Sequence, residues 1–322
     1  MTEEEEDKPP GHPTPLIRAR GLEELFGFSE IYLKYEGDNE TGTHKDRIAR
    51  LHVERAVNLG YDTLTAGTCG NYGVALAHYS RVFGIEVKIF IPSSYRHTRV
   101  EEMRRLGAEV VAIPRKYEEA TELSARFASE KGWYDANPGP KNREPNYSAY
   151  AQISREILEE LGESPTAVAV PIGNGTTLAG MYYGFKDVDK DGVLNGMPRM
   201  IAASTAYGNP IVTSFLQGLD YVLQLSPSNV IETEFNEPLV SYKSYDGEDA
   251  LNAIRETRGY AFPVTDTKMF ELSHLIRIKE GLDVLPASTS ALEALRLFVR
   301  VEPHNSKYVV VLTGGKPSWR KR

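Results

Sequence analysis

The chain has 322 residues, 37 Lys and Arg against 45 Asp and Glu, a formal net charge of −8 and one cysteine. One cysteine excludes an internal disulfide and a thiolate zinc cage, and the negative charge argues against nucleic acid or an anionic membrane as the main partner. No apolar run approaches the roughly 18 residues of a membrane span. The acidic start, Glu3 to Glu6 before Pro9 and Pro10, fits no targeting peptide, so we expect a soluble cytoplasmic protein.

Residues 1–15 are charged and rich in proline, and we expect a mobile tail there. Beyond it, short β-like runs alternate with helical patterns, which is typical of βαβ units and a mostly parallel sheet. The expected strands, in chain order, are 31–35, 63–66, 87–91, 109–113, 167–170, 200–203 and 308–312. Apolar residues spaced near 3.6 predict helices across 49–57, 75–83, 156–161 and 292–299.

The segment 137–146 (NPGPKNREPN) is so rich in Pro, Gly and Asn that we expect an irregular loop. It suggests a small mobile domain of residues 50–145 and a large domain of residues 16–49 and 146–322, with the chain passing between them twice. In open α/β sheets, ligands bind beyond the carboxyl ends of the strands, where such units meet. Three of the motifs described next lie at such ends.

Residues 39–47 read NETGTHKDR. Thr43 and Asp46 have the spacing of a capping box, which places Lys45 in the first turn of a helix. The partial positive charge of a helix N-terminus disfavours an ammonium group there, and a neutral amine is what a Schiff-base lysine needs. The alternative is a solvated lysine beside an acidic cap.

Two glycine-rich turns each join an expected strand to an expected helix. Residues 66–73 (AGTCGNYG) would expose backbone N–H groups that could hold a carboxylate, or simply form a tight turn with helix caps. Residues 168–178 (VAVPIGNGTTL) read as a phosphate cradle. Leu178 stands where a dinucleotide fingerprint needs Gly or Ala, and no Gly-Lys-Ser/Thr of a P-loop follows, so the phosphate of a smaller cofactor remains.

A fourth motif, VVVLTGGK at residues 309–316, places Thr313 at the carboxyl end of a strand, where its hydroxyl could meet a ring nitrogen. Together the motifs resemble those of the fold-type II pyridoxal-phosphate enzymes, the tryptophan synthase β-like superfamily, and within it most closely the threonine synthase family. NETGTHKDR resembles N-P-T-G-S-F-K-D-R, and residues 68–71 (TCGN) resemble the family's Ser/Thr-Ser-Gly-Asn loop. PIGNGTT at 171–177 resembles P-V-G-N-x-G-N, LPASTSAL at 285–292 resembles E-P-A-S-A-A-x-L, and LTGGK at 312–316 resembles L-T-G-H-G-L-K.

These motifs occur in the family's order and span residues 13 to 317. The resemblance implies an α/β fold of two three-layer domains with mostly parallel sheets and pyridoxal 5'-phosphate in the interdomain cleft. The large domain, residues 16–49 and 146–322, would bind the cofactor. The resemblance also implies a homodimer that acts on a small-molecule amino-acid substrate.

The site roles follow from the same resemblance. Lys45 would form the Schiff base, and its freed amine would be the base for the substrate's α-proton. Asn71 would bond the cofactor's ring hydroxyl, and Thr313 would lie opposite the pyridine nitrogen. The residues implied to bind the phosphate are Gly173, Asn174, Gly175, Thr176 and Thr177. The residues implied to bind the substrate are Thr68, Cys69, Gly70, Asn71 and Tyr72.

The implied reaction is elimination or replacement on a small L-amino acid, first of all O-phosphohomoserine plus water to threonine plus phosphate. The alternatives are a cysteine synthase or serine/threonine dehydratase and, from another class, a non-catalytic cofactor-binding sensor or partner subunit. After Asn137-Pro138, Pro140 replaces the arginine of the family's substrate-binding segment, and the E-G-Q-K run that follows it there is missing. Lys141 or Arg143 could replace that charge, or both could be solvated loop cations. Tyr72 is bulkier than the family's Thr and would narrow the pocket.

Three further features stay open. Cys69 stands in place of a family Ser, either as a small filler or as a thiol facing the substrate with a pKa lowered by the helix N-terminus. Asp187, Asp189 and Asp191 match the opening half of a calcium loop, but Pro198 occupies the twelfth position, where Glu is usual, so a weak cation site and a charged surface turn both remain. The histidines show no metal-binding spacing, so no metal site is predicted, and the resemblance implies that His44 packs near the cofactor.

Overall fold

The computed structural model describes residues 12–27, 30–68, 70–94, 97–189, 196–302 and 306–315. Residues 1–11 of the expected tail therefore lie outside the described residues. Thr14, which also belongs to that stretch, is buried and donates a hydrogen bond from its hydroxyl to Glu36 Oε1 at 2.7 Å.

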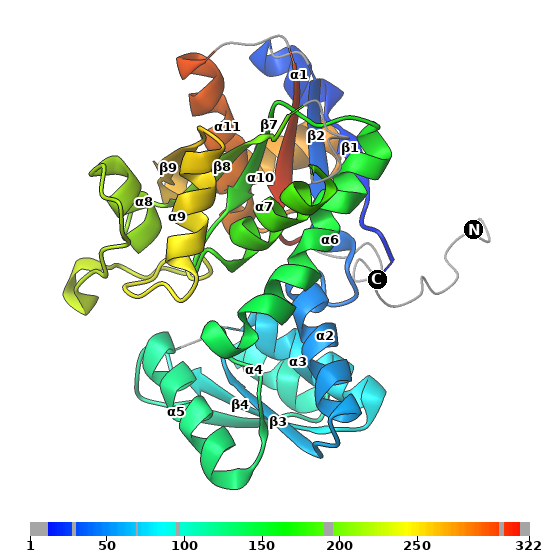
Figure 1. The fold of residues 1–322 in the computed structure, drawn as a ribbon, viewed down its shortest axis with the longest axis vertical. Helices are drawn as coiled ribbons and strands as arrows, with labels where there is room; N and C mark the ends of the chain where they lie inside the picture. The colour runs from blue at the N-terminus through cyan, green and yellow to red at the C-terminus, as the bar shows by residue number, and fades with distance from the viewer. Residues whose placement is uncertain are drawn as a thin grey trace.

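Two sheets form the framework, and Figure 1 shows them one above the other. The six-stranded sheet contains, in spatial order, β1 (Leu16–Arg18), β2 (Glu30–Tyr35), β10 (Lys307–Leu312), β7 (Ala167–Pro171), β8 (Arg199–Thr205) and β9 (Tyr260–Val264). The four-stranded sheet contains β5 (Glu109–Ile113), β4 (Glu86–Pro92), β3 (Thr63–Gly67) and β6 (Tyr134–Asp135). Every pairing is parallel except that of β1 with β2. All the strands expected from the sequence are confirmed, as is the α/β fold class.

Helices cover both sheets. They are α1 (Arg20–Phe26), α2 (Lys45–Asn58), α3 (Asn71–Phe83), α4 (His97–Arg105), α5 (Tyr117–Lys131), α6 (Arg143–Leu161), α7 (Thr176–Asp189), α8 (Pro210–Leu216), α9 (Gly247–Glu256), α10 (Asp266–Glu280) and α11 (Ser290–Val301). Short 3₁₀ helices occupy Glu36–Asp38, Pro140–Asn142, Pro227–Asn229 and Pro286–Thr289. The helices expected within 49–57, 75–83, 156–161 and 292–299 are confirmed as parts of α2, α3, α6 and α11.

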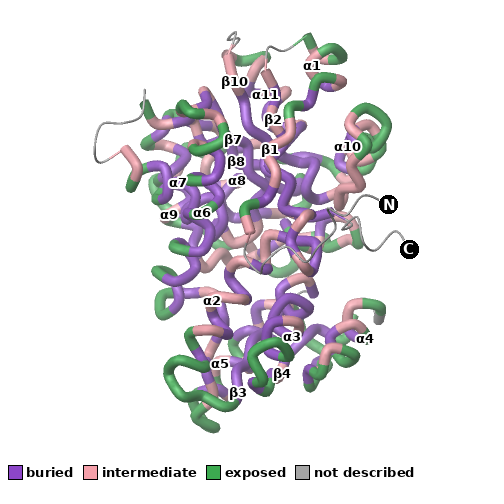
Figure 2. The backbone as a smooth tube through the Cα atoms, turned by 90° about the vertical axis from the view of Figure 1, so that its right-hand side faces the viewer, coloured by how far each residue is buried: buried purple, intermediate pink, exposed green. Residues whose placement is uncertain are grey.

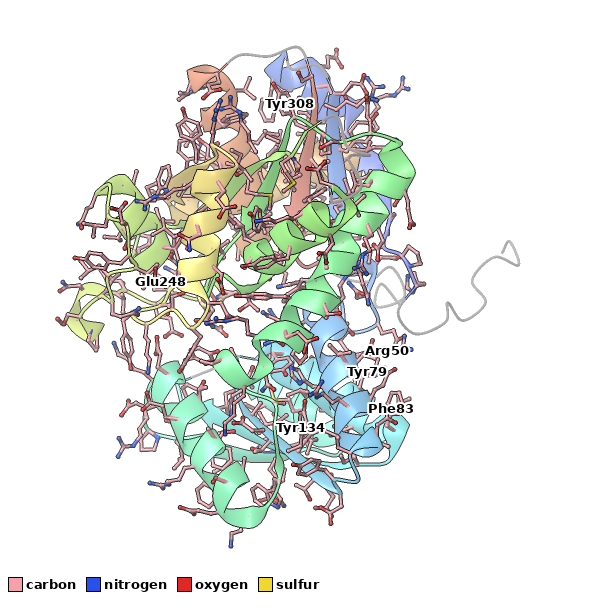
Figure 3. All side chains as sticks on the ribbon, in the orientation of Figure 1. Arg50, Tyr79, Phe83, Tyr134, Glu248 and Tyr308 are labelled. Carbon is pink, nitrogen blue, oxygen red and sulfur yellow. The ribbon has the colours of Figure 1, made fainter. Side chains whose placement is uncertain are left out.

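The alternation of side chains along the strands divides the core between two faces of the large sheet. Val168 and Val170 of β7 join α6 and α7 on one face, whereas Ala167 and Ala169 join α1, α10 and α11 on the other. Strands buried on both faces read as continuous apolar runs, which is why β7 and β10 were visible in the sequence. Figure 2 shows buried residues along the strands of both sheets and exposed residues gathered on outlying helices such as α4 and α5. The rings of Tyr308 and Tyr134, labelled in Figure 3, are buried with the upper and the lower sheet respectively.

The expectation of an irregular loop over 137–146 is wrong in its second half. A 3₁₀ turn at Pro140–Asn142 leads directly into α6, which begins at Arg143. Pro145 therefore lies in the first helical turn, where the missing N–H costs nothing because no carbonyl is available for it within the helix. None of the helices in the described part of the chain is long and apolar enough to cross a membrane.

Candidate active site

A cavity lies between the two sheets, beyond the carboxyl ends of β10, β7 and β3. It is lined by residues from both halves of the molecule. The residues predicted from the sequence that line it are Lys45, Thr68, Asn71, Tyr72, Gly173, Asn174, Gly175, Thr176, Thr177 and Thr313. Gly70 is not among the lining residues, and Cys69 lies outside the described residues. The structure thus brings together motifs that are up to 268 positions apart in the chain, from Lys45 to Thr313 (313 − 45 = 268).

Lys45 is the first residue of α2, as predicted, but the capping box is not formed. The Asp46 carboxylate accepts hydrogen bonds from the Thr41 backbone N–H at 3.0 Å and the Thr41 hydroxyl at 2.6 Å, and makes none with Thr43. Thr43 instead forms a β-bridge with Gly314, and its hydroxyl accepts the N–H of Lys45 at 3.3 Å. The β-bridge just beyond β10 therefore holds this segment. The helix does not begin with the capping pair that the sequence suggested.

The amine of Lys45 meets a tyrosine that the sequence analysis missed. Lys45 Nζ donates to the hydroxyl of Tyr150 at 3.3 Å and lies 5.7 Å from the centroid of its ring. Tyr150 is on α6 and has no exposed surface. No local motif marks this tyrosine, because its position depends on the packing of α6 against the rest of the fold.

His44 lies between Tyr150 and Thr313. Its ring is stacked on that of Tyr150, with centroids 5.4 Å apart, and its Nδ1 lies 3.0 Å from the carbonyl oxygen of Thr313. Burial, with the neighbouring charge of Lys45, lowers the pKa of His44 to about 3. The imidazole is therefore neutral, and since a carbonyl can only accept, Nδ1 carries the proton.

The turn after β7 has the geometry of an anion cradle. A Cβ on Gly173 would lie 2.6 Å from the carbonyl oxygen of Pro238, and Gly175 adopts a φ of +89°, which favours glycine. Helix α7 begins immediately afterwards at Thr176, so its first N–H groups have no partner within the helix. Backbone donors and the positive end of a helix suit a phosphate group, so these residues fit the phosphate of a cofactor such as pyridoxal phosphate.

The loop after β3 carries the predicted substrate residues. Thr68 Oγ1 accepts the N–H groups of Gly70 and Gly73, both at 3.2 Å, which fixes the turn into α3. Asn71 is the first residue of α3 and lines the cavity. Tyr72 also lines it, but its hydroxyl donates to the carbonyl of Ala136 at 2.8 Å, and burial raises its pKa well above the usual value. The Tyr72 ring therefore shapes the wall while its hydroxyl is engaged within the fold.

Thr313 closes the cavity at the end of β10. Its hydroxyl lies 3.1 Å from that of Ser288, whose oxygen also accepts the N–H of Gly314 at 2.9 Å. Ser288 belongs to the LPASTSAL segment, which the sequence analysis recognised as a motif without assigning a role to any of its residues.

A further wall of the cavity comes from residues that no sequence signal identified. Residues 237–241 lie over the glycine turn, and Tyr117 of α5 and Asn146 of α6 also line the cavity. Glu118 Oε1 accepts the N–H of Tyr242 at 3.2 Å, which docks α5 of the small sheet on this segment of the large one.

The two loop cations considered from the sequence do not reach this cavity. Lys141 and Arg143 are not among its lining residues, and Arg143 Nε lies 3.3 Å from Asp249 Oδ2. Within the described part of the lining, Lys45 is the one positively charged side chain, since His44 is neutral. The described residues also hold no group of three or more metal-ligating side chains, and Asp191 of the suggested calcium loop lies outside them.

Comparison with known proteins shows the family of the chain. The family model described as pyridoxal-phosphate dependent enzyme matches residues 8–314. The chain belongs to this family. Its cofactor is therefore pyridoxal 5'-phosphate, and the arrangement of its two sheets is that of the fold-type II enzymes.

Among curated relatives, the threonine synthase of Methanocaldococcus jannaschii is 29% identical over 307 residues, covering 94% of this chain and 74% of the relative. That of Methanosarcina acetivorans is 29% identical over 290 residues, covering 89% of this chain and 69% of the relative. The family and these relatives identify the chain as a pyridoxal-phosphate-dependent lyase. Among solved structures, serine racemase from Dictyostelium discoideum has a TM-score of 0.76 at 19% identity, covering 95% of this chain and 93% of that one. Threonine deaminase isoform 2 from Solanum lycopersicum has a TM-score of 0.78 at 18% identity, covering 96% of this chain and 85% of that one. At these identities the solved structures support the fold alone.

Proposed function

We propose that this enzyme catalyses elimination or replacement on a small L-amino acid, with O-phosphohomoserine and water as the first candidate substrates and threonine and phosphate as products. The observation that carries the proposal is the cavity itself, which Lys45 lines together with the glycine cradle of residues 173–177 and the first residues of α3. The sequence similarity to threonine synthases supports the choice of substrate.

The roles of the residues follow from where they lie. Pyridoxal phosphate, when bound, supplies a conjugated ring that takes up the electron pair left behind by the α-proton. Lys45 Nζ would hold the cofactor covalently and, once displaced by substrate, would take the α-proton, since a neutral amine beside the α-carbon is a suitable base. The Thr313 hydroxyl would lie at the ring nitrogen, and a hydroxyl there leaves that nitrogen unprotonated, which suits elimination better than transamination.

The two glycine turns would hold the charged groups of the cofactor and of the substrate. The N–H groups at the start of α7 would bind the cofactor phosphate, together with the hydroxyls of Thr176 and Thr177. The start of α3 would bind the substrate carboxylate, with Asn71 reaching the ring hydroxyl of the cofactor. The first residues of both helices line one cavity, and the partial positive charge of a helix N-terminus favours a ligand with an anionic group near each.

A second candidate is a dehydratase that acts on serine or threonine, or a cysteine synthase. The observation that favours it is the charge of the lining, since a phosphorylated side chain needs a cation and the described lining supplies only Lys45, which is already used. A sensor or partner subunit without turnover is the alternative from another class. Assembly as a homodimer and a cytoplasmic location stay predictions from the sequence.

The experiment is a spectrum followed by a substrate panel. Purified protein with pyridoxal phosphate is expected to show the visible absorbance of a lysine-bound cofactor, Lys45→Ala to lose it, and the loop variant Lys141→Ala to keep it. O-phosphohomoserine is then expected to release phosphate and threonine. Release of ammonia from serine or threonine without phosphate release would select the second candidate. Absorbance without turnover of any amino acid would select the sensor, and wild type without the absorbance would overturn the proposal.

A further inference from the structure

We propose that Tyr150 is a positioning residue for the amine of Lys45. The inference rests on the role proposed above for Lys45 and adds a residue from outside the recognised motifs.

The position of Tyr150 is set by the close crossing of α6 and α7. A Cβ on Gly180 of α7 would lie 2.8 Å from Cβ of Tyr150, and a Cβ on Gly184 would lie 2.7 Å from the carbonyl oxygen of Ala151. Two glycines one helical turn apart therefore let the backbone of α6 approach α7 more closely than side chains would allow. The Tyr150 ring is consequently carried to the cavity by backbone packing, and its fully buried state leaves it little freedom to move.

The hydroxyl of Tyr150 contacts the amine of Lys45. On one side it accepts the hydrogen bond from Lys45 Nζ at 3.3 Å. On the other side the side chain of Thr177, in the first turn of α7, lowers the pKa of the phenol and so opposes the effect of burial. The ring is held in addition by His44, which stacks on it and is itself tied to the Thr313 carbonyl. The amine of Lys45 thus meets a side chain whose own position is fixed by its packing.

The phenol suits this role in either protonation state of the amine. Burial raises the pKa of Tyr150, so the phenol keeps its proton at neutral pH. A neutral phenol has one donor and two acceptor positions. It can accept from an ammonium group or donate to the lone pair of a neutral amine. In both cases no buried polar group is left without a partner, and the direction of the Lys45 nitrogen stays fixed.

The test compares Tyr150→Phe, which removes the hydroxyl and keeps the ring, with the matched control Tyr182→Phe. Tyr182 of α7 is also buried, but its hydroxyl bonds Glu256 and Lys186 outside the cavity. The first measurement is the rate at which apoprotein captures pyridoxal phosphate, followed by visible absorbance. In this step the lone pair of Nζ forms a bond to the aldehyde carbon, and the aldehyde oxygen leaves as water with two protons from the amine. The second measurement is the affinity for pyridoxamine phosphate, which has no aldehyde and reports on the cradle alone.

Tyr150→Phe is expected to slow capture about tenfold and to lower kcat about tenfold with little change in KM, because the lost hydrogen bond orients the attacking nitrogen. Its affinity for pyridoxamine phosphate and all properties of Tyr182→Phe are expected to stay within about twofold of wild type. Capture at the wild-type rate would overturn the proposal. So would an equal loss of pyridoxamine phosphate affinity, since the hydroxyl would then act only on the cradle.

The proposed function can fail separately, because capture is measured without any amino acid. If wild type captures the cofactor but turns over no substrate, the reaction assignment fails and the capture ratio still decides the role of Tyr150. If Tyr150→Phe does not fold, the wild-type apoprotein gives the answer: magnetisation transfer between the ring protons of Tyr150 and the ε-methylene of Lys45 is expected by NMR. Its absence would show that the two side chains do not meet in solution and would end the proposal.

Discussion

The hydroxyl of Thr176 donates a 2.6 Å hydrogen bond to Oδ2 of Asp246. This contact joins the first residue of α7 to the residue that precedes α9, and the backbone N–H of Asp246 also donates to the carbonyl of Asn174 at 3.2 Å. The Asp246 side chain has no exposed surface, and burial raises its pKa. The glycine cradle is therefore held from behind by a buried carboxyl group, independently of any phosphate bound in front of it.

The support by Asp246 leads to a prediction about cofactor affinity. Asp246→Ala is expected to weaken binding of pyridoxal phosphate about tenfold, because the Thr176 hydroxyl and the turn lose a buried partner. Asp246→Asn keeps an acceptor of the same shape and is expected to retain most of the affinity. Fluorescence titration of apoprotein measures both, with Asp220→Ala, a fully exposed carboxylate, as control. Unchanged affinity in Asp246→Ala would show that the cradle needs no support from this side.

A second prediction concerns acid stability. Arg47 Nε and Nη2 donate to the two oxygens of the buried Glu36 at 2.7 and 2.9 Å. Burial alone would raise the pKa of Glu36, but the charge and hydrogen bonds of Arg47 outweigh it and lower the pKa to about 2. Since this value lies below that of an unfolded glutamate, the pair stabilises the fold above about pH 4.5, and this contribution is lost as the pH falls towards 2.

Urea unfolding at a series of pH values measures this contribution. Glu36→Gln is expected to lower the free energy of unfolding at pH 7 by about 1.5–3 kcal/mol, because Arg47 loses its charged hydrogen bonds with Glu36 and keeps only those with Glu156, at 2.6 and 2.8 Å. It is also expected to flatten the dependence on pH between 5 and 2. Glu130→Gln, at an exposed pair with Arg126, should change stability by less than about 0.5 kcal/mol. An unaltered pH slope in Glu36→Gln would contradict the prediction.

The fold was predictable where strands are buried on both faces. The three strands that the sequence analysis missed, β1, β6 and β9, are all at the edges of their sheets. These three are short or interrupted, as with the two residues of β6 and with Pro263 in β9, whereas the fourth edge strand, β5, keeps an apolar run and was predicted. Their apolar signal is therefore weak, and only the paired neighbour defines them.

The cavity was predictable where one local motif places several residues. Each of the turns after β3, β7 and β10 follows a strand directly and holds glycines and a polar group within a few positions. Their residues could therefore be found from spacing. Tyr150 and Asp246 could not. Tyr150 meets Lys45 across 105 positions, and Asp246 meets Thr176 across 70. Such contacts depend on how α6 and α9 pack, which no local pattern encodes.

The crossing of α6 and α7 provides a third prediction. Gly180→Ala would place a methyl group 2.8 Å from Cβ of Tyr150, so we expect a loss of about 1–3 kcal/mol in unfolding free energy from overpacking. We also expect slower capture of pyridoxal phosphate, because the ring that orients Lys45 is displaced. Gly132→Ala at the end of α5 is the control, since its Cβ meets nothing but its φ is +69°. It should cost about 1 kcal/mol without any change in capture. Equal capture rates in the two variants would mean that the crossing does not place Tyr150.

The hydroxyl of Thr313 gives the last prediction. The Thr313 carbonyl accepts from the backbone N–H of His44 at 2.9 Å and from its ring, so the backbone position is fixed whatever side chain is present. Thr313→Val keeps the shape and removes the hydroxyl, whereas Thr313→Ser keeps the hydroxyl and removes a methyl group. If the hydroxyl meets the ring nitrogen of the cofactor, Thr313→Val should lower kcat about tenfold and shift the visible absorbance, and Thr313→Ser should restore both to within about twofold of wild type. Steady-state kinetics and spectra of the two variants make the comparison. A Thr313→Val enzyme with the spectrum and kcat of wild type would show that the hydroxyl serves only its contact with Ser288.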